Sequence, residues 1–398
     1  MWALMWTTML LTAAPQMEAR TLDDRQLSGR LVSLTTDELV LDSPDGEVTV
    51  PIKDLLSLSP EAAAVAAETP RGILVELVDG TSLDVKEYEV RQGMARLTLA
   101  DQQTAEVPTA VISAVRFHQQ SDEISKQWDE IVAADTAGDV LLIRKGDTLD
   151  FLEGLLGDTL AEEEAVQFTV GDTLLPVKRT KIEGLLYAHP AGRSLPEAVC
   201  LVLDQAGDRI PASEFELSDG QLDITTPAGL RLRRPLEAIA RLDFSRGKVE
   251  YLSQMKPESI DWTPYFAPLG AQDAQHAFFR FRTDRGLREP TLSLGGKTYQ
   301  RGLALHSRTE LVYRLDGRWR RLEAVAGIDD SVQGKGHVRL TIRGDGQVLY
   351  DEQIAGRDAP RPVSLDVSGV RRLTILVDFG DDLDVADHLD LCEARIIK

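Results

Sequence analysis

Four side chains in the C-terminal third of the chain have the chemistry to contact a polyhydroxylated ligand. His306 lies at the end of the segment GLALHS, and its imidazole offers both a hydrogen-bond donor and an acceptor to a sugar hydroxyl. Asp329 and Asp330 follow the apolar segment VAGI, and their carboxylates suit a pair of neighbouring hydroxyls or a hard cation. Trp319 lies between arginines in GRWRRL, where a half-exposed ring stacks on a sugar face. These four residues are the candidate carbohydrate-binding residues.

Each candidate also has a structural interpretation. A histidine at a strand end can tie that strand to a neighbouring loop, and aspartates in a turn can cap the turn through their own backbone. A tryptophan in an alternating strand packs into a core. The functional interpretation predicts a shallow site on loops at one end of a sandwich, reached by His306, Asp329 and Asp330. It also predicts that Asp329→Ala combined with His306→Ala weakens binding while the fold survives.

The sequence contains no complete catalytic motif. It lacks His-Glu-x-x-His, Gly-x-Ser-x-Gly, a phosphate-binding loop and the glycine run of a dinucleotide fold. Cys200 and Cys392 fit neither a disulfide framework nor a zinc site, and we expect both to be small buried side chains. The acidic run 378–390 lacks the spacing of a calcium loop and is expected to be a solvated loop. We therefore predict no catalytic residues, no cofactor and no metal site.

Composition excludes several classes of partner. The chain has 398 residues, of which 43% are hydrophobic, and 65 acidic residues outnumber 44 basic ones to give a net charge of −21. Such a charge repels nucleic acid and anionic lipid. No apolar run reaches the length of a membrane span. Residues 2–14 are apolar and uncharged, which predicts a signal peptide over residues 1–19, a secreted or periplasmic location, and no membrane span after cleavage. The alternatives are a buried first strand and a retained membrane anchor.

The middle of the chain repeats one pattern four times. Pro51, Pro108, Pro176 and Pro235 each follow a strand-like stretch and precede two apolar residues that could point into a core. The third copy needs a two-residue insertion to fit. The second apolar positions, Leu58, Val115, Leu185 and Leu242, are predicted to be buried. Each copy is interpreted as a unit of four or five short strands, similar to a small Sm-like barrel or a strongly bent sheet.

These signals predict an all-β chain of tandem β-units followed by a jelly-roll β-sandwich. Two units joined by a short helix at 60–69 occupy residues 25–120. An amphipathic helix with Ser121 or Asp122 as its cap and Trp128 in its apolar stripe opens residues 121–250, which hold two more units. A connector covers 251–290, and the sandwich covers 291–398. The sandwich segment has 16 basic and 17 acidic residues, a net charge of −1, which leaves −20 of the total before it.

The C-terminal segment resembles the NPCBM family of carbohydrate-binding modules. The resemblance rests on GKTYQRGLALHS (296–307), VAGIDDS (325–331), IRGDGQVLY (342–350) and ADHLDLCEARI (386–396), in that order. It implies a galactose-binding-like sandwich that binds glycans. One departure is visible, because Leu391 or Cys392 stands where an aromatic residue is common. The β-units followed by this module also resemble exported multidomain proteins of planctomycete-type bacteria.

The function expected from the sequence is that of an exported, non-enzymatic protein whose C-terminal sandwich binds carbohydrate. The first alternative is a structural or assembly protein that uses the β-units and the sandwich for contacts with a protein partner of unknown identity. The less favoured alternative is a glycoside hydrolase with an unrecognised site, since any two carboxylates can meet in space. A cleft with two facing carboxylates would favour the hydrolase.

Overall fold

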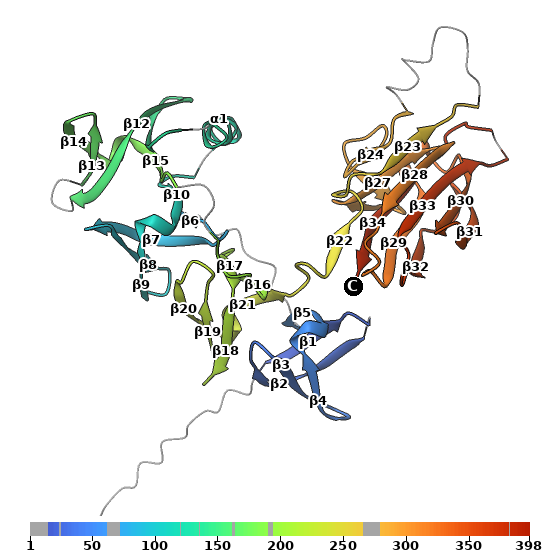
Figure 1. Cartoon of the computed structure of the whole chain (residues 1–398), viewed down its shortest axis with the longest axis horizontal. Helices are drawn as coiled ribbons and strands as arrows, with labels where there is room; N and C mark the ends of the chain where they lie inside the picture. The colour runs from blue at the N-terminus through green and yellow to red at the C-terminus, as the bar shows by residue number, and fades with distance from the viewer. Residues whose placement is uncertain are drawn as a thin grey trace, which may run out of the picture. The chain divides into compact units, whose positions relative to one another are not determined.

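The computed structural model describes residues 15–398 except 24, 62–71, 120, 135, 161–163, 190–193, 266–278 and 382. The chain divides into two compact units, with the boundary between Arg246 and Gly247 (Figure 1). Strands dominate both units, as the sequence predicts. Among the described helices, none is long and apolar enough to cross a membrane.

The first unit contains four copies of one strand plan. Three copies have five antiparallel strands, and the fourth has six because its second strand is divided into Arg209–Ala212 and Glu214–Ser218. In every copy the last strand returns to pair with the first, and a single 3-10 turn precedes that last strand. Among the described residues, the strand before this turn pairs only with the strand that precedes it in the chain, so the sheet does not close into a barrel. The copies are β1 (Gln16–Thr21), β2 (Gln26–Leu34), β3 (Glu38–Ser43), β4 (Gly46–Pro51), η1 (Ile52–Asp54) and β5 (Leu55–Pro60); β6 (Ile73–Leu77), β7 (Ser82–Arg91), β8 (Met94–Leu99), β9 (Thr104–Pro108), η2 (Thr109–Val111) and β10 (Ile112–Arg116); β11 (Asp139–Lys145), β12 (Thr148–Leu160), β13 (Ala165–Val170), β14 (Thr173–Lys178), η4 (Arg179–Lys181) and β15 (Ile182–Leu186); and β16 (Cys200–Asp204), β17 (Arg209–Ala212), β18 (Glu214–Ser218), β19 (Gln221–Thr225), β20 (Arg231–Pro235), η5 (Leu236–Ala238) and β21 (Ile239–Asp243).

The residue before each 3-10 turn adopts the backbone angle that proline favours. Its φ is −61° at Pro51 and Pro108 and −57° at Pro235, and Lys178 takes the same position in the third copy with a φ of −60°. The third copy therefore has no two-residue insertion, and the expected alignment on Pro176 is wrong. Lysine adopts this φ without a proline ring, so proline favours the turn but is not required for it.

The predicted burial of the four equivalent apolar positions is confirmed. Leu58, Val115, Leu185 and Leu242 are all fully buried. The register also brings them together in pairs, because Leu58 lies opposite Leu242 where β5 pairs with β21, and Val115 lies opposite Leu185 where β10 pairs with β15. The closing strands thus join the first copy to the fourth and the second copy to the third.

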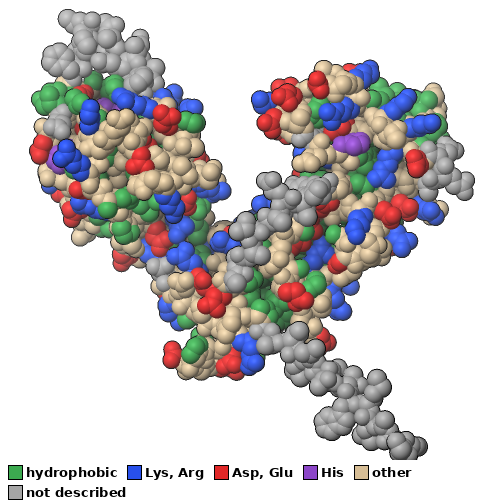
Figure 2. Space-filling model, turned by 180° about the vertical axis from the view of Figure 1, so that it is seen from behind, with side chains coloured by type: hydrophobic (Ala, Val, Ile, Leu, Met, Phe, Trp, Pro, Cys, Tyr) green, Lys and Arg blue, Asp and Glu red, His purple; other side chains and the backbone are tan. Residues whose placement is uncertain are grey.

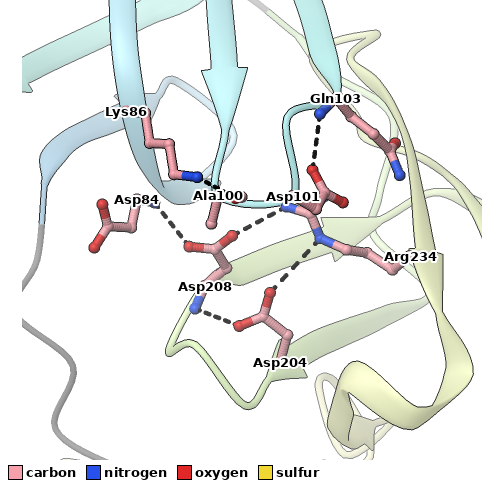
Figure 3. Close-up of polar contacts among 8 residues, drawn as sticks. All are labelled: Asp84, Lys86, Ala100, Asp101, Gln103, Asp204, Asp208 and Arg234. Carbon is pink, nitrogen blue, oxygen red and sulfur yellow. Dashed lines mark hydrogen bonds and ion pairs between the residues drawn. The ribbon is translucent and has the colours of Figure 1, made fainter.

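A buried arginine adds a polar junction between the second and fourth copies (Figure 3). The Arg234 guanidinium lies 3.0 Å from an Asp208 carboxylate oxygen, 3.6 Å from Asp204 and 3.9 Å from Asp101. Asp208 also accepts the backbone N–H of Asp84 on β7. Burial, followed by the charge of Asp204, raises the pKa of Asp208 to about 6. The Arg234 guanidinium therefore forms ion pairs with three carboxylates from two copies.

The predicted amphipathic helix is α1 (Asp122–Val132), and Ser121 caps it by accepting the Ile124 backbone N–H. Trp128 is fully buried, as expected. Its ring lies against Gly184, where a Cβ would come within 2.5 Å of ring carbons, and the Arg116 guanidinium lies 4.6 Å from the ring centroid. Glycine is needed at that position for the helix to pack on β15.

Two segments predicted from the sequence differ from the structure or lie outside the described residues. β1 includes residues 16–19, and its Met17 and Ala19 are fully buried and pair with β2 and β5. A cut after Ala19 would remove Gln16–Ala19 from this strand. The helix expected at 60–69 falls on residues 62–71, outside the described residues, although β5 extends to Pro60.

The second unit is a β-sandwich of two antiparallel sheets. One sheet has the order β24-β27-β34-β29-β32 with β22 also on β34, and the other has the order β23-β28-β33-β30-β31. Apolar side chains from both sheets form one core. The strands are β22 (Val249–Tyr251), β23 (Ser259–Trp262), β24 (Arg282–Thr283), β25 (Leu292–Leu294), β26 (Lys297–Tyr299), β27 (Gly302–His306), β28 (Thr309–Arg314), β29 (Arg321–Ile328), β30 (His337–Gly344), β31 (Gln347–Ala355), β32 (Arg361–Asp366), β33 (Arg372–Phe379) and β34 (His388–Ile397).

The predicted connector 251–290 supplies edge strands to this sandwich. β22 pairs with β34, β23 with β28, and β24 with β27. The compact unit accordingly starts at Gly247 and not at 291. The strands are two to four residues long, and such short segments carry little periodicity in the sequence.

Candidate functional site

The structure brings two of the four candidate residues together at one end of the sandwich. His306 is the last residue of β27 and lies directly opposite His388, the first residue of β34. Asp329 follows the end of β29, and its backbone N–H donates to the His388 carbonyl at 2.9 Å. Strand pairing between β27, β34 and β29 therefore places these groups side by side.

Trp319 lies away from this cluster. It precedes β29, whereas Asp329 follows that strand, so the length of β29 separates the two residues. The indole is only 6% exposed and belongs to the sandwich core, with the Lys398 ammonium 5.4 Å from the ring centroid. The half-exposed stacking position expected for this ring is contradicted by its burial.

Asp330 is exposed, but its carboxylate is already engaged. One oxygen accepts the Gly295 backbone N–H and the other accepts the Gly296 N–H, both at 2.9 Å. Gly295 and Gly296 form the turn between β25 and β26, where their φ values of 60° and 80° favour glycine. Asp330 thus fixes this turn against the start of η6 (Asp330–Val332).

The remaining groups form a buried polar cluster, which we define as His306, Asp329, His388 and Asp390. His306 Nδ1 lies 2.6 Å from the Ser307 carbonyl oxygen, and its ring packs on Phe279 with centroids 4.0 Å apart. The His388 ring meets the His306 ring edge-on at 5.6 Å. The surface position assumed for His306 and Asp329 is not found, because strand pairing draws both inward.

Two carboxyl groups of this cluster face each other. Asp390 is fully buried, and burial, followed by the neighbouring Asp329 carboxyl, raises the pKa of Asp390 well above its usual range. Asp329 Oδ1 accepts the Ser331 backbone N–H at 2.8 Å. Because two ionised carboxylates repel each other in a dry site, the raised pKa favours the protonated form of Asp390.

The two imidazoles are neutral at neutral pH. Burial, then the neighbouring His306 and the Arg288 charge, lowers the pKa of His388 to about 4. Burial likewise lowers the pKa of His306. Beside them, burial raises the pKa of Asp387 to about 6, although this carboxylate accepts the Ser307 hydroxyl at 2.6 Å and the His337 backbone N–H at 3.0 Å.

This geometry suits positioning better than catalysis. The Asp329–Asp390 pair is closed to solvent, whereas glycoside hydrolysis needs two carboxyl groups on either side of a substrate bond. Among the described residues, no His, Cys, Asp and Glu side chains gather in a way that could hold a metal ion. The cluster instead holds the ends of β27, β29 and β34 in register. Asp329→Ala with His306→Ala would therefore damage the fold, contrary to the expectation from the sequence.

Sequence reasoning missed His388, Asp387 and Asp390. The acidic run 378–390 was expected to be solvated, yet Asp387 and Asp390 are fully buried. A usable signal was present, since both flank His388 in the quoted motif ADHLDLCEARI and an apolar strand follows. In the same strand Leu391 and Cys392 are buried, the latter as a free thiol, so the aromatic residue common at this place would be a core side chain and not a surface ring.

One known protein family matches the C-terminal unit. Residues 263–397 match the NPCBM/NEW2 domain family, which confirms the resemblance seen in the sequence. An α-1,3-galactosidase B of Akkermansia muciniphila is 32% identical over 117 residues, which is 28% of this chain and 15% of that enzyme. The match thus spans a small part of its curated relative.

Solved structures with related folds include two carbohydrate-binding modules of Clostridium perfringens. CBM51 from GH95 in complex with methyl-galactose is 20% identical and has a TM-score of 0.32, covering 37% of this chain and 99% of that one. CBM51-2 in complex with GlcNAc, with the INT domains of ZmpB, is 18% identical with a TM-score of 0.33, covering 46% of this chain and 39% of that one.

Proposed function

We propose that this chain is an exported, non-enzymatic protein whose C-terminal sandwich binds carbohydrate. The observation that carries the proposal is the match of residues 263–397 to a family of carbohydrate-binding modules. The buried cluster supports it, because rigid strand ends beneath surface loops are a suitable base for a binding site. The binding surface would then lie on exposed groups around the cluster and not on His306 or Asp329.

The test is a glycan array probed with the full chain. We expect binding to a restricted set of glycans and no release of reducing sugar from them. Binding to none of the glycans would favour the assembly alternative. Hydrolysis of a bound glycan would contradict the non-enzymatic part of the proposal and favour the hydrolase.

Export is proposed from the apolar, uncharged residues 2–14. The pairing of β1 with β2 and β5 adds one constraint, since the mature chain must retain Gln16–Thr21 to complete the first sheet. N-terminal sequencing of the exported protein tests this. We expect a start at or before Gln16, and a start at Arg20 would contradict the structure.

One observation favours an assembly role as the second candidate. In β14 the outward positions hold Leu174 and Pro176, whereas the matching positions of the other copies hold glutamate, threonine or arginine. Leu155, Thr169 and Leu174 lie in one row across β12, β13 and β14, and Leu155 is 66% and Leu174 57% exposed. Exposed apolar patches of this kind are typical of protein interfaces.

Sedimentation of the parent and of a Leu155→Ser, Leu174→Ser variant tests this second role. An assembly protein that uses this patch would lose its association in the variant. A parent that stays monomeric at high concentration, and binds glycans, would leave carbohydrate binding as the better account.

A further inference from the structure

A groove of about 460 Å³ lies along one side of the sandwich. Its lining residues are Ile260, Arg280, Phe281, Arg282, Thr283 and Arg285. Ile260 belongs to β23 and Arg282 to β24, and these are the edge strands of the two different sheets. The groove therefore runs where the two sheets present their free edges on the same side.

The groove concentrates positive charge in a strongly acidic protein. Arg280, Arg282, Arg285 and Arg288 fall within nine residues that contain one acidic residue, Asp284. The Asp284 carboxylate accepts the Gly302 backbone N–H at 3.0 Å and forms no ion pair with the described arginines. Among the described residues, Arg282 donates to the Gly286 carbonyl at 3.3 Å. In the part of the sandwich that the structure describes, Arg280, Arg282 and Arg285 form no ion pair.

Other arginines of the same unit behave differently. Figure 2 shows acidic and basic side chains interspersed over the visible surface. Many arginines of the sandwich lie within 3 Å of a carboxylate oxygen, namely Arg318 beside Asp316, Arg339 beside Asp351, Arg361 beside Asp358, Arg372 beside Glu258 and Arg395 beside Glu323. The guanidinium groups of the groove are thus left available for an anionic ligand.

The lining also suits a sugar. Arg280 and Arg282 are two residues apart in the sequence, and both line the groove. Phe281 is half-buried against the sandwich core, and Ile260 is 45% exposed, which gives the groove an apolar part beside the guanidinium groups. A sugar ring has apolar C–H faces, and a planar guanidinium pairs with a carboxylate or sulfate through two parallel hydrogen bonds.

We propose that the groove lined by Arg280, Arg282 and Arg285 binds the carboxylate or sulfate groups of an acidic polysaccharide. The proposal rests on the proposed carbohydrate-binding function and specifies its ligand class. The apolar lining distinguishes it from a general attraction for polyanions. Because the contacts are charged and accessible, binding should weaken as salt is added.

The experiment measures binding of the full chain to polygalacturonate, chondroitin sulfate, neutral galactan and polyglutamate. An Arg280→Gln, Arg285→Gln variant is compared with the parent and with an Arg357→Gln, Arg371→Gln control. Arg357 and Arg371 are exposed and lie outside the groove, so the control loses the same charge. We expect the parent to bind an acidic polysaccharide, the groove variant to bind it roughly tenfold or more weakly, and the control to match the parent.

The outcomes separate the two proposals. Equal loss in the groove variant and the control, or equal binding of polyglutamate and the acidic polysaccharides, would overturn the groove assignment. Binding of galactan alone would also overturn it while leaving carbohydrate binding intact. Failure to bind any of the three polysaccharides, or any glycan on the array, would overturn the proposed function itself. Unchanged melting of both variants shows that the fold is retained.

Discussion

The repeat junctions and the end of the sandwich bury opposite kinds of side chain. At the junctions Leu58 meets Leu242 and Val115 meets Leu185, so apolar pairs join the copies. At the sandwich end His306, Asp329, His388 and Asp390 are buried, and several of their polar atoms have no protein partner. Burying alkyl groups stabilises at any pH, whereas burying titratable groups makes stability depend on pH. Histidine and aspartate, which are common in binding sites, can thus be buried structural residues beneath a site.

The largest effect is expected from removing the edge strands of the sandwich. A fragment 247–398 should melt cooperatively, whereas 291–398 lacks β22, β23 and β24 and the buried Leu252 and Leu287. We expect the shorter fragment to melt at a much lower temperature or without cooperativity, as measured by calorimetry. If both fragments melted at the same temperature and with the same cooperativity, the domain boundary predicted at residue 291 would be correct.

The polar junction between copies offers the next largest effect. Arg234→Met leaves Asp204 and Asp208 buried without their cation, which should cost about 3–5 kcal/mol of the free energy of unfolding. Arg233→Met is the matched control, because its exposed pairing with Asp223 lies on the neighbouring outward position. Denaturant unfolding should show a large loss for the first variant and little change for the second. Similar losses would contradict the role given to Arg234.

An apolar junction gives a comparable or smaller effect. Leu185→Ala removes a buried side chain opposite Val115 and should cost about 2–5 kcal/mol. Leu174→Ala, at an exposed position of the same copy, should change stability by about 0.5 kcal/mol or less. The loss at Leu185 should be the same at pH 5 and pH 8, since no titratable group is involved. If the loss of unfolding free energy in Leu185→Ala depended on pH, it would contradict the difference between the apolar junctions and the buried polar cluster.

The buried carboxyl pair predicts a small effect at neutral pH with a distinctive pH dependence. The pKa of Asp390 is raised in the folded protein, so the folded state binds a proton that the unfolded state releases above about pH 4. The free energy of unfolding therefore falls as the pH rises from about 4 toward the raised pKa. Asp390→Asn cannot ionise and should remove this decline, at a cost of about 1 kcal/mol or less at pH 7.

The control for this variant is Asp381→Asn, an exposed acid of the same segment. It should leave the pH profile of the parent unchanged. His388 has the opposite effect on the free energy of unfolding. Its pKa is lowered to about 4 in the folded protein, so the free energy of unfolding falls as the pH drops below about 6.5. An Asp390→Asn profile that parallels the parent's would contradict the raised pKa of Asp390.

Local patterns predicted the fold better than the site. Ser121 as a cap, Trp128 on an apolar stripe and Leu58 after a repeated proline are features of neighbouring residues, and the structure confirms each. The insertion in the third copy was wrong, because Lys178 adopts the proline-like φ while Pro176 lies two residues earlier. The sequence can place a proline but does not show which residue precedes the 3-10 turn.

The candidate site depended on long-range pairing that the sequence does not display. His306 and Asp390 are 84 positions apart, and only the register of β27 and β34 makes them neighbours and draws them inward. The arginines at 280–288 were visible in the sequence but stood out only once β23 and β24 were seen to flank a groove. A residue's type gives its chemistry, and its strand's place in the sheet decides whether that chemistry reaches solvent.

The most direct test of the account compares the two halves of the chain on one glycan array. Fragments ending at Arg246 and starting at Gly247 follow the boundary between the compact units. The account predicts that the fragment 247–398 reproduces the glycan binding of the full chain and that the fragment ending at Arg246 binds none. Glycan binding by the repeat fragment, with none by a folded 247–398, would contradict it.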